Sequence, residues 1–289
     1  GMVNLKRVKK LTLSRVLITR GLLEKVQESH GSIPSIQELS IYPVPNGRFR
    51  DNATELIELT CANVETLQVF NCSAPVLMAI SNLKTLRNLI LDDALGRIDV
   101  SHVLKLKDLR TLALHRHNMS RALLFQNVFV GIGKVRSFLT SLDLSEWFGS
   151  RYVGCEALRK TLSHFADLQE LRLSGMTAWS RSVCKCVAEC NQNLKLFWYT
   201  PPNPTILGDA PRFPDTLDAK TALVMRRSLL KLQTLVFPPF VQFDPNALDI
   251  LTSGPSFKFF ACDSCDGPHG RAVEFRHLPV SASFDARKA

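Results

Sequence analysis

The 289-residue sequence lacks any uninterrupted apolar run of the roughly 18 residues that a membrane-spanning helix needs. Its charged first residues are not followed by the apolar stretch of a secretory signal peptide. The first absence excludes a membrane-spanning helical protein, and the second argues against a secreted one. We therefore expect an intracellular protein, cytoplasmic or nuclear, that makes no contact with a membrane.

The sequence also lacks a recognisable catalytic or nucleotide-binding constellation. Its seven histidines form no HExxH or comparable metal-binding motif, and no Ser-His-Asp set follows from the spacing. The segment 131–134, Gly-Ile-Gly-Lys, lacks the earlier glycine and the following Ser or Thr that a phosphate-binding loop requires. We therefore predict that the protein is not an enzyme and uses no cofactor.

Acidic residues are fewer than basic ones, at 26 against 36, which gives a net charge of +10. A surplus of positive charge is typical of proteins that bind acidic partners, nucleic acid among them. A soluble basic surface without such a partner gives the same composition. The composition alone favours this simpler interpretation.

One apolar pattern recurs ten times, and internal repeats of this kind decide the architecture. Each copy has an apolar residue, two variable residues, a second apolar residue, one variable residue and a third apolar residue. The copies begin at positions 8, 36, 64, 86, 109, 139, 168, 194, 232 and 257. Successive first positions therefore lie 28, 28, 22, 23, 30, 29, 26, 38 and 25 residues apart, and the 38 indicates an insertion.

The spacing within each copy predicts a short strand, because its last two apolar residues are two apart and project from the same face. Stacked copies then form a parallel sheet with this face buried. The segments between copies show helical apolar spacing, as in Leu56, Ile57 and Leu59. The sequence therefore predicts an α/β fold, a right-handed solenoid or horseshoe of about ten repeats, with a concave parallel β-sheet and helical convex returns.

The segment 64–72, Val-Glu-Thr-Leu-Gln-Val-Phe-Asn-Cys, fits the consensus LxxLxLxxN/C of the leucine-rich-repeat superfamily. The chain resembles this superfamily over roughly residues 5 to 265, although Asp, Trp, Met or Pro stands at most of the final consensus positions. Its helix-bearing returns are similar to those of the intracellular, cysteine-containing, ribonuclease-inhibitor-like branch, which includes the repeat arms of F-box proteins. The resemblance implies a scaffold or adaptor that binds another protein, and, for the F-box comparison, a substrate-recognition arm of a ubiquitin-ligase-type complex.

The repeats predict one solenoid over residues 1–265, followed by a partly disordered C-terminal cap or tail over residues 266–289. The wide spacing places an insertion at residues 200–231. Prolines exclude a helix from most of its first half, and Asp215 or Thr216 is then expected to cap a helix that begins near Leu217. An inserted loop at the rim of a solenoid often carries function, and a tolerated insertion is equally consistent with the pattern.

The eight cysteines fit repeat positions better than a metal site or a disulfide framework. Cys262 and Cys265 form a C-x-x-C pair, but a zinc site needs about four ligands, and the other cysteines lie several repeats away. On one return helix, Cys186 and Cys190 share a face that Cys184 does not. We expect structural cysteines in a reducing compartment, with no bound metal.

Strand alternation also predicts the lining of the concave face, because the positions before, between and after the two buried residues point away from the core. The middle of this face is polar, whereas its last three repeats are apolar around Trp198, an arrangement typical of a protein-binding hot spot. The predicted partner-binding residues are Trp198, Arg172, Phe259, Leu196, Val236, Asp143 and His115. In the alternative interpretation, the insertion or the tail covers the apolar residues.

A nucleic-acid partner requires basic residues that gather on one surface. The concave positions carry few bases, and positive charge collects instead at the N-terminal edge and around Arg226, Arg227 and Lys231. These three residues form the predicted site of an alternative function, that of an RNA- or nucleic-acid-associated repeat protein that uses its basic edges.

Overall fold

The structure is a computed structural model of the whole chain. It describes residues 8–14, 18–28, 36–42, 49–92, 102–115, 138–144, 155–174, 180–200, 215–237, 241–254 and 256–262. The predicted tail at residues 266–289 and the proline-rich part of the insertion lie outside these ranges, as do Cys265 and the segment 131–134.

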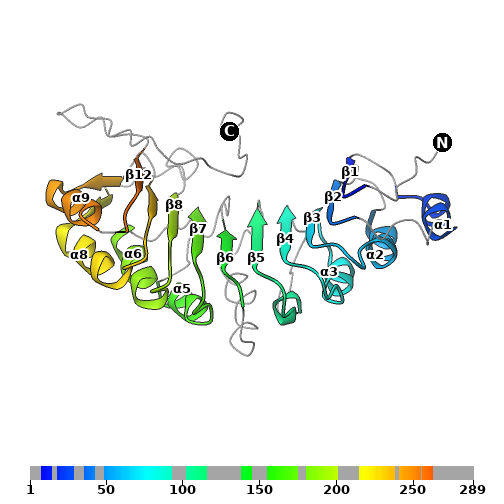
Figure 1. Cartoon of the computed structure of the whole chain (residues 1–289), viewed down its shortest axis with the longest axis horizontal. Coiled ribbons are helices and arrows are strands. Elements are labelled where there is room, and N and C mark those ends of the chain that lie inside the picture. Colours follow the sequence, from blue (N-terminus) through cyan, green and yellow to red (C-terminus); the bar gives the residue numbers. More distant parts are fainter. Residues whose placement is uncertain are drawn as a thin grey trace.

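Ten strands of the described residues form one sheet, and every neighbouring pair is parallel. The strands follow chain order, which confirms the solenoid predicted from the repeat. They line the inner side of an arc, and the helices lie on its outer side (Figure 1). The strands are β1 Lys10–Ser14, β2 Glu38–Tyr42, β3 Thr66–Phe70, β4 Asn88–Asp92, β5 Thr111–His115, β6 Ser141–Leu144, β7 Glu170–Ser174, β8 Leu196–Thr200, β10 Thr234–Phe237 and β12 Phe259–Cys262.

The register of the sheet places equivalent repeat positions side by side. Leu67 of β3 pairs with Leu89 of β4, which pairs with Leu112 of β5, and all three side chains are fully buried. The central outward positions form a parallel row in which Asp143 pairs with Arg172, and Arg172 with Trp198. A slip of one residue would have moved the leucines to the concave face, so the alternation predicted from the sequence is confirmed.

Most returns carry a helix in their described residues. The described helices are α1 Arg20–Glu28, α2 Phe49–Thr60, α3 Ala74–Ile80, α5 Cys155–Leu162, α6 Ser180–Cys190, α8 Ala219–Ser228 and α9 Pro245–Thr252. The described part of the return between β4 and β5 contains a 3₁₀ turn, η2 Val103–Lys105. Helices bury the apolar side chains of the returns, Leu56 and Ile57 of α2 among them, against the back of the sheet.

The start of α8 differs from the expectation for the insertion. Residues Asp215–Leu217 form strand β9, which pairs in parallel with β11 Val241–Phe243 in a second, two-stranded sheet. The helix cap is Asp218, whose Oδ1 accepts a hydrogen bond of 2.7 Å from the backbone N–H of Thr221. The prediction of a cap at Asp215 or Thr216 was wrong because Leu217 is needed in the core, where it is fully buried in extended backbone.

The cysteines of the described residues are unbridged, and four of them, Cys61, Cys72, Cys184 and Cys186, are buried. Burial raises the pKa of the Cys61 and Cys72 thiols to about 12. Thiols with so high a pKa remain protonated and act as small apolar side chains. Within the described ranges, no three His, Cys, Asp or Glu side chains are placed to hold a metal ion.

Candidate concave binding site

A continuous row of polar contacts crosses the middle of the concave face. Gln68 on β3 donates from Nε2 to Oδ2 of Asp92 on β4, at 2.7 Å, and Oδ1 of Asp92 lies 2.9 Å from Nδ1 of His115 on β5. On the other side of His115, its Nε2 is 3.5 Å from Oδ2 of Asp143 on β6, a long contact between charges. We call Gln68, Asp92, His115, Asp143, Arg172 and Trp198 the concave ladder.

The ladder continues from Asp143 to the apolar end of the face. Arg172 on β7 donates from Nη1 to Oδ2 of Asp143 at 3.3 Å. The Arg172 guanidinium carbon lies 5.9 Å from the ring centroid of Trp198 on β8, within the range of a cation–π contact. Each step joins neighbouring strands. Asp92 and His115, Asp143 and Arg172, and Arg172 and Trp198 are direct partners in the register, whereas the other two contacts run diagonally between strands.

Two carboxylates of the ladder are buried although their strand positions face away from the core. Asp143 is 6% exposed and Asp92 is 9% exposed, because the neighbouring ladder residues cover them. Asp143, predicted as a partner-binding residue, therefore exposes little surface of its own. The Asp143 carboxylate holds the cationic groups of His115 and Arg172 in place. A buried carboxylate needs such partners to offset its lost hydration.

His115 stays protonated between its two acidic neighbours. Burial alone would lower the pKa of its imidazole, but the hydrogen bonds and negative charges of Asp143 and Asp92 outweigh burial and raise the pKa to about 9. The protonated ring is a donor at both nitrogens, which suits a position between two carboxylates. With Arg172, the ladder then has two positive and two negative charges and no net charge.

Trp198 is the large exposed group of the ladder. Its side chain is 41% exposed, whereas Phe197 and Tyr199, which flank it in the sequence, are fully buried on the other face of the sheet. Leu196 and Val236, also predicted as binding residues, are half-buried beside it. Phe259 occupies the outward position of β12 that pairs with Thr234, and its side chain lies outside the description.

A second aromatic group lies at the other end of the concave face, and the sequence analysis did not single it out. The rings of Tyr42 on β2 and Phe70 on β3 have centroids 6.4 Å apart, and both side chains are half-buried. Burial and the negative charge of Asp92 raise the pKa of Tyr42, against the opposing effect of Lys10. The register could have revealed this pair, because both residues occupy the last outward position of their strands.

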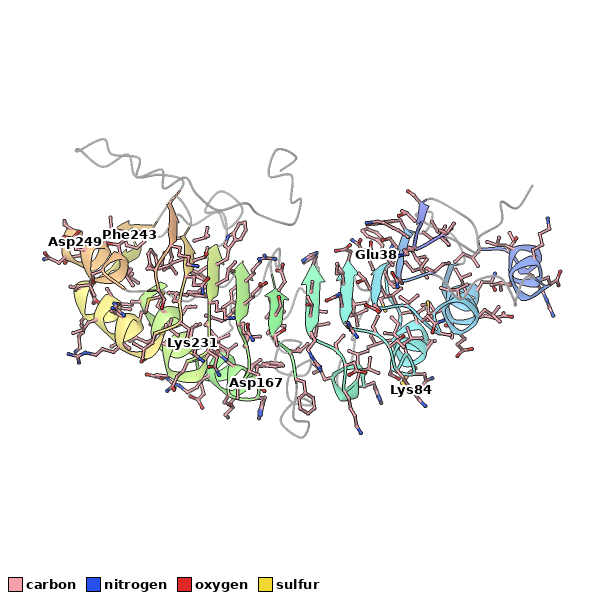
Figure 2. The ribbon with its side chains drawn as sticks, in the orientation of Figure 1. Glu38, Lys84, Asp167, Lys231, Phe243 and Asp249 are labelled. Carbon is pink, nitrogen blue, oxygen red and sulfur yellow. The ribbon has the colours of Figure 1, made fainter. Side chains whose placement is uncertain are left out.

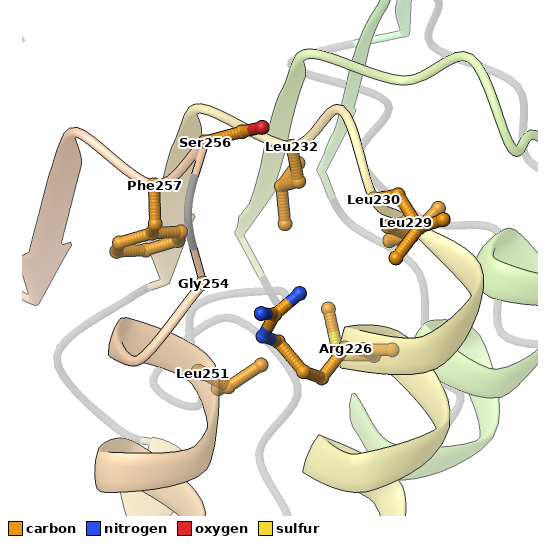
Figure 3. Close-up of a pocket in the computed structure, with 9 residues that line it drawn as sticks. Arg226, Leu229, Leu230, Leu232, Leu251, Gly254, Ser256 and Phe257 are labelled. Atoms are coloured by element: carbon orange, nitrogen blue, oxygen red, sulfur yellow. The ribbon is translucent and has the colours of Figure 1, made fainter.

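The three basic residues predicted for a nucleic-acid partner differ in their surroundings. The side chain of Arg226 on α8 lies in a small pocket between α8 and α9, lined by Leu251, Gly254 and Phe257 among others (Figure 3). Arg227 is exposed on the same helix, whereas Nζ of Lys231 donates to Oδ1 of Asn193 at 2.7 Å, in the turn before β8.

Comparisons with known proteins agree with this fold. No family model and no curated protein sequence matches the chain. Among solved structures, the chain is similar to the leucine-rich repeat-containing protein LegL7 from Legionella pneumophila, with 16% identity, a TM-score of 0.54, and coverage of 90% of this chain and 84% of that one. A protein from Bacteroides fragilis matches with 14% identity, a TM-score of 0.44, and coverage of 90% and 75%.

The repeat pattern, the parallel sheet and the similarity to LegL7 together define the chain as a leucine-rich-repeat solenoid. Solenoids of this fold present a continuous curved sheet, a surface suited to contacts with other macromolecules. No helix among the described residues is long and apolar enough to cross a membrane.

Proposed function

We propose that the protein is an interaction scaffold or adaptor, without catalytic activity, that binds another protein on its concave face. Trp198 carries the proposal. Trp198 is 41% exposed at the central outward position of β8, and half-buried Leu196 and Val236 lie beside it. An exposed Trp in such apolar surroundings is the kind of residue that contributes most to protein interfaces.

The concave ladder supports this proposal because it prepares Arg172 for contact. Asp143 fixes one guanidinium nitrogen at 3.3 Å, and the guanidinium also lies over Trp198. A side chain held in this way loses less conformational entropy when a partner binds. The Arg172 side chain stays 34% exposed, which leaves surface that a partner can contact.

The resemblance of the repeats to the arms of F-box proteins supports a finer role for this face, substrate recognition within a ubiquitin-ligase-type complex. In either setting His115 and Asp143 act as positioning residues, and Phe259 extends the apolar end of the face by its place in the register. The alternative of a nucleic-acid partner belongs to a different surface, which is considered below.

The test begins with affinity capture from cell lysate, followed by mass spectrometry. We expect Trp198→Ala to weaken the captured partner's binding by at least ~2 kcal/mol while leaving the melting temperature nearly unchanged. Leu223→Ala is the matched control, because Leu223 is 39% exposed on α8, away from the concave face. It should retain the partner.

Two other results would contradict the proposal. A stability loss of ~3–5 kcal/mol in Trp198→Ala would show that the ring is covered by another part of the chain. A stable variant with unchanged binding would remove this face from consideration.

A further inference from the structure

A second surface lies along the edge of the sheet where the chain enters the strands, away from the concave ladder. A groove of about 450 Å³ runs along this edge and is lined by Arg110, Phe138, Asp167, Gln169, Lys195 and Lys231, among others. Asp167 and Lys231 lie at this lower edge in Figure 2. No motif of the sequence joins these residues, which come from five repeats.

The repeat itself aligns the groove. Arg110, Gln169 and Lys195 each stand immediately before a strand. The backbone N–H of Lys195 donates to the carbonyl of Gln169 at 2.7 Å, and that of Arg110 donates to the carbonyl of Arg87 at 2.8 Å. Because neighbouring strands are ~4.8 Å apart, the three steps from β5 to β8 place Arg110 and Lys195 roughly 14 Å apart along the edge. The groove is therefore a linear site.

The groove has a surplus of positive charge that is held in position. Arg110 donates from Nη1 to the carbonyls of Lys107 at 2.6 Å and Leu109 at 3.1 Å, which fixes its guanidinium at one end. Lys231 is fixed by its 2.7 Å hydrogen bond to Asn193 at the other end. Lys195 lies between them, exposed and without a side-chain partner in the described ranges. Asp167 also lines the groove, and Oδ1 of Asp108 lies 4.0 Å from Nη2 of Arg110, so two acidic groups lie near these three cations.

An aromatic ring lies among these cations. Phe138 is 42% exposed and precedes Leu139, which is buried at the entry to β6. Half-buried Gln169 adds an amide group that can both donate and accept hydrogen bonds. Grooves that bind single strands combine cations for the phosphates with exposed aromatic rings on which bases stack. An acidic peptide would use the cations but would give Phe138 no comparable role.

We propose that this edge groove binds single-stranded nucleic acid, with the phosphates along Arg110, Lys195 and Lys231 and a base stacked on Phe138. The chain's net charge of +10 would favour the approach of such a polyanion. This proposal does not rest on the concave face, and of the basic residues predicted from sequence it uses only Lys231.

Fluorescence anisotropy with a labelled, mixed-sequence eight-nucleotide RNA tests the proposal. The Lys195→Gln/Lys231→Gln double variant should bind at least ~10-fold more weakly at low salt. Its affinity should also depend less on salt, because each neutralised phosphate contact contributes about 0.7 to the logarithmic slope for single strands. Phe138→Ala should weaken binding by roughly 5-fold or more through lost stacking.

The matched control is Lys25→Gln, because Lys25 is exposed on α1 at the far end of the arc (Figure 1). It should bind RNA like the unaltered protein, and so should Trp198→Ala, which separates this site from the concave one. The proposal is overturned if Lys25→Gln loses as much affinity as the double variant, or if no RNA binds at low salt. It is also overturned if polyglutamate of equal charge competes as well as unlabelled RNA, which would assign the groove to an acidic protein.

Discussion

The two ends of the concave face both carry aromatic residues at outward positions, yet they differ in what those residues contact. Tyr42 and Phe70 pack against each other at 6.4 Å between ring centroids, and both are half-buried. Trp198 has a guanidinium on one side and remains 41% exposed. Tyr42 and Phe70 cover much of each other's apolar surface, whereas Trp198 leaves a large area of its ring exposed to a partner. This difference in contacts, and not only the residue types, separates the two ends.

The ladder between the two ends should show the largest effect on stability. Asp143→Asn removes the buried charge that faces both His115 and Arg172, so we expect a loss of about 1–3 kcal/mol in the free energy of unfolding. Denaturant unfolding measures this loss. Glu170→Gln is the control, because Glu170 is half-buried on the adjacent strand and accepts one 3.2 Å hydrogen bond from Ser141. Equal stability of the two variants would show that the ladder is not a connected unit.

The Tyr42–Phe70 end should contribute to stability and not to binding. Phe70→Ala removes the aromatic contact, which is worth about 1 kcal/mol, and the burial of a half-buried ring, which is worth roughly as much again. Binding of the partner captured through Trp198 should stay within experimental error. A binding loss as large as that of Trp198→Ala would mean that the partner spans both ends of the face.

The last effect concerns pH. Because the folded-state pKa of His115 is raised to about 9 from an ordinary value of 6.5, its contribution to stability is complete below pH 6.5 and is lost as the pH rises through 9. Melting temperatures measured between pH 6 and pH 10 should fall across this window. In His115→Gln the melting temperature should fall less over this pH range, because the variant has no imidazole to lose its proton. An identical fall in both proteins would contradict the raised pKa of His115.

Strand positions, their register and most helical returns could be predicted from the sequence, because apolar spacing alone determines them. The repeat at Val64, Leu67 and Val69 is an example, since all three are fully buried where the pattern requires it. The burial of Asp143 could not be predicted, because it depends on the lengths and charges of side chains on both neighbouring strands. The start of α8 was missed because a three-residue strand, β9, has too short a pattern to compete with a helix cap signal.

The edge groove was missed for another reason. Its residues precede the strands and belong to turns, so the two-residue alternation that defines the concave face does not apply to them. The repeat register aligns Arg110 and Lys195, and Lys231 lines the same groove from the turn before β10, but their separation in sequence, at 85 and 36 residues, hides the cluster. Lys231 was noticed only through its neighbours on α8, and one of these, Arg226, faces a different pocket.

The pocket between α8 and α9 brings together two positions that are distant in the sequence, Gly254 and Arg226. A Cβ atom on Gly254 would lie 3.2 Å from Nε and 3.3 Å from Cζ of Arg226, closer than side chains ordinarily approach (Figure 3). A side chain at 254 therefore fits only if the flexible end of the Arg226 side chain moves by a few tenths of an ångström. Substitutions at 254 and 226 should for this reason be coupled, although 28 residues separate the two positions.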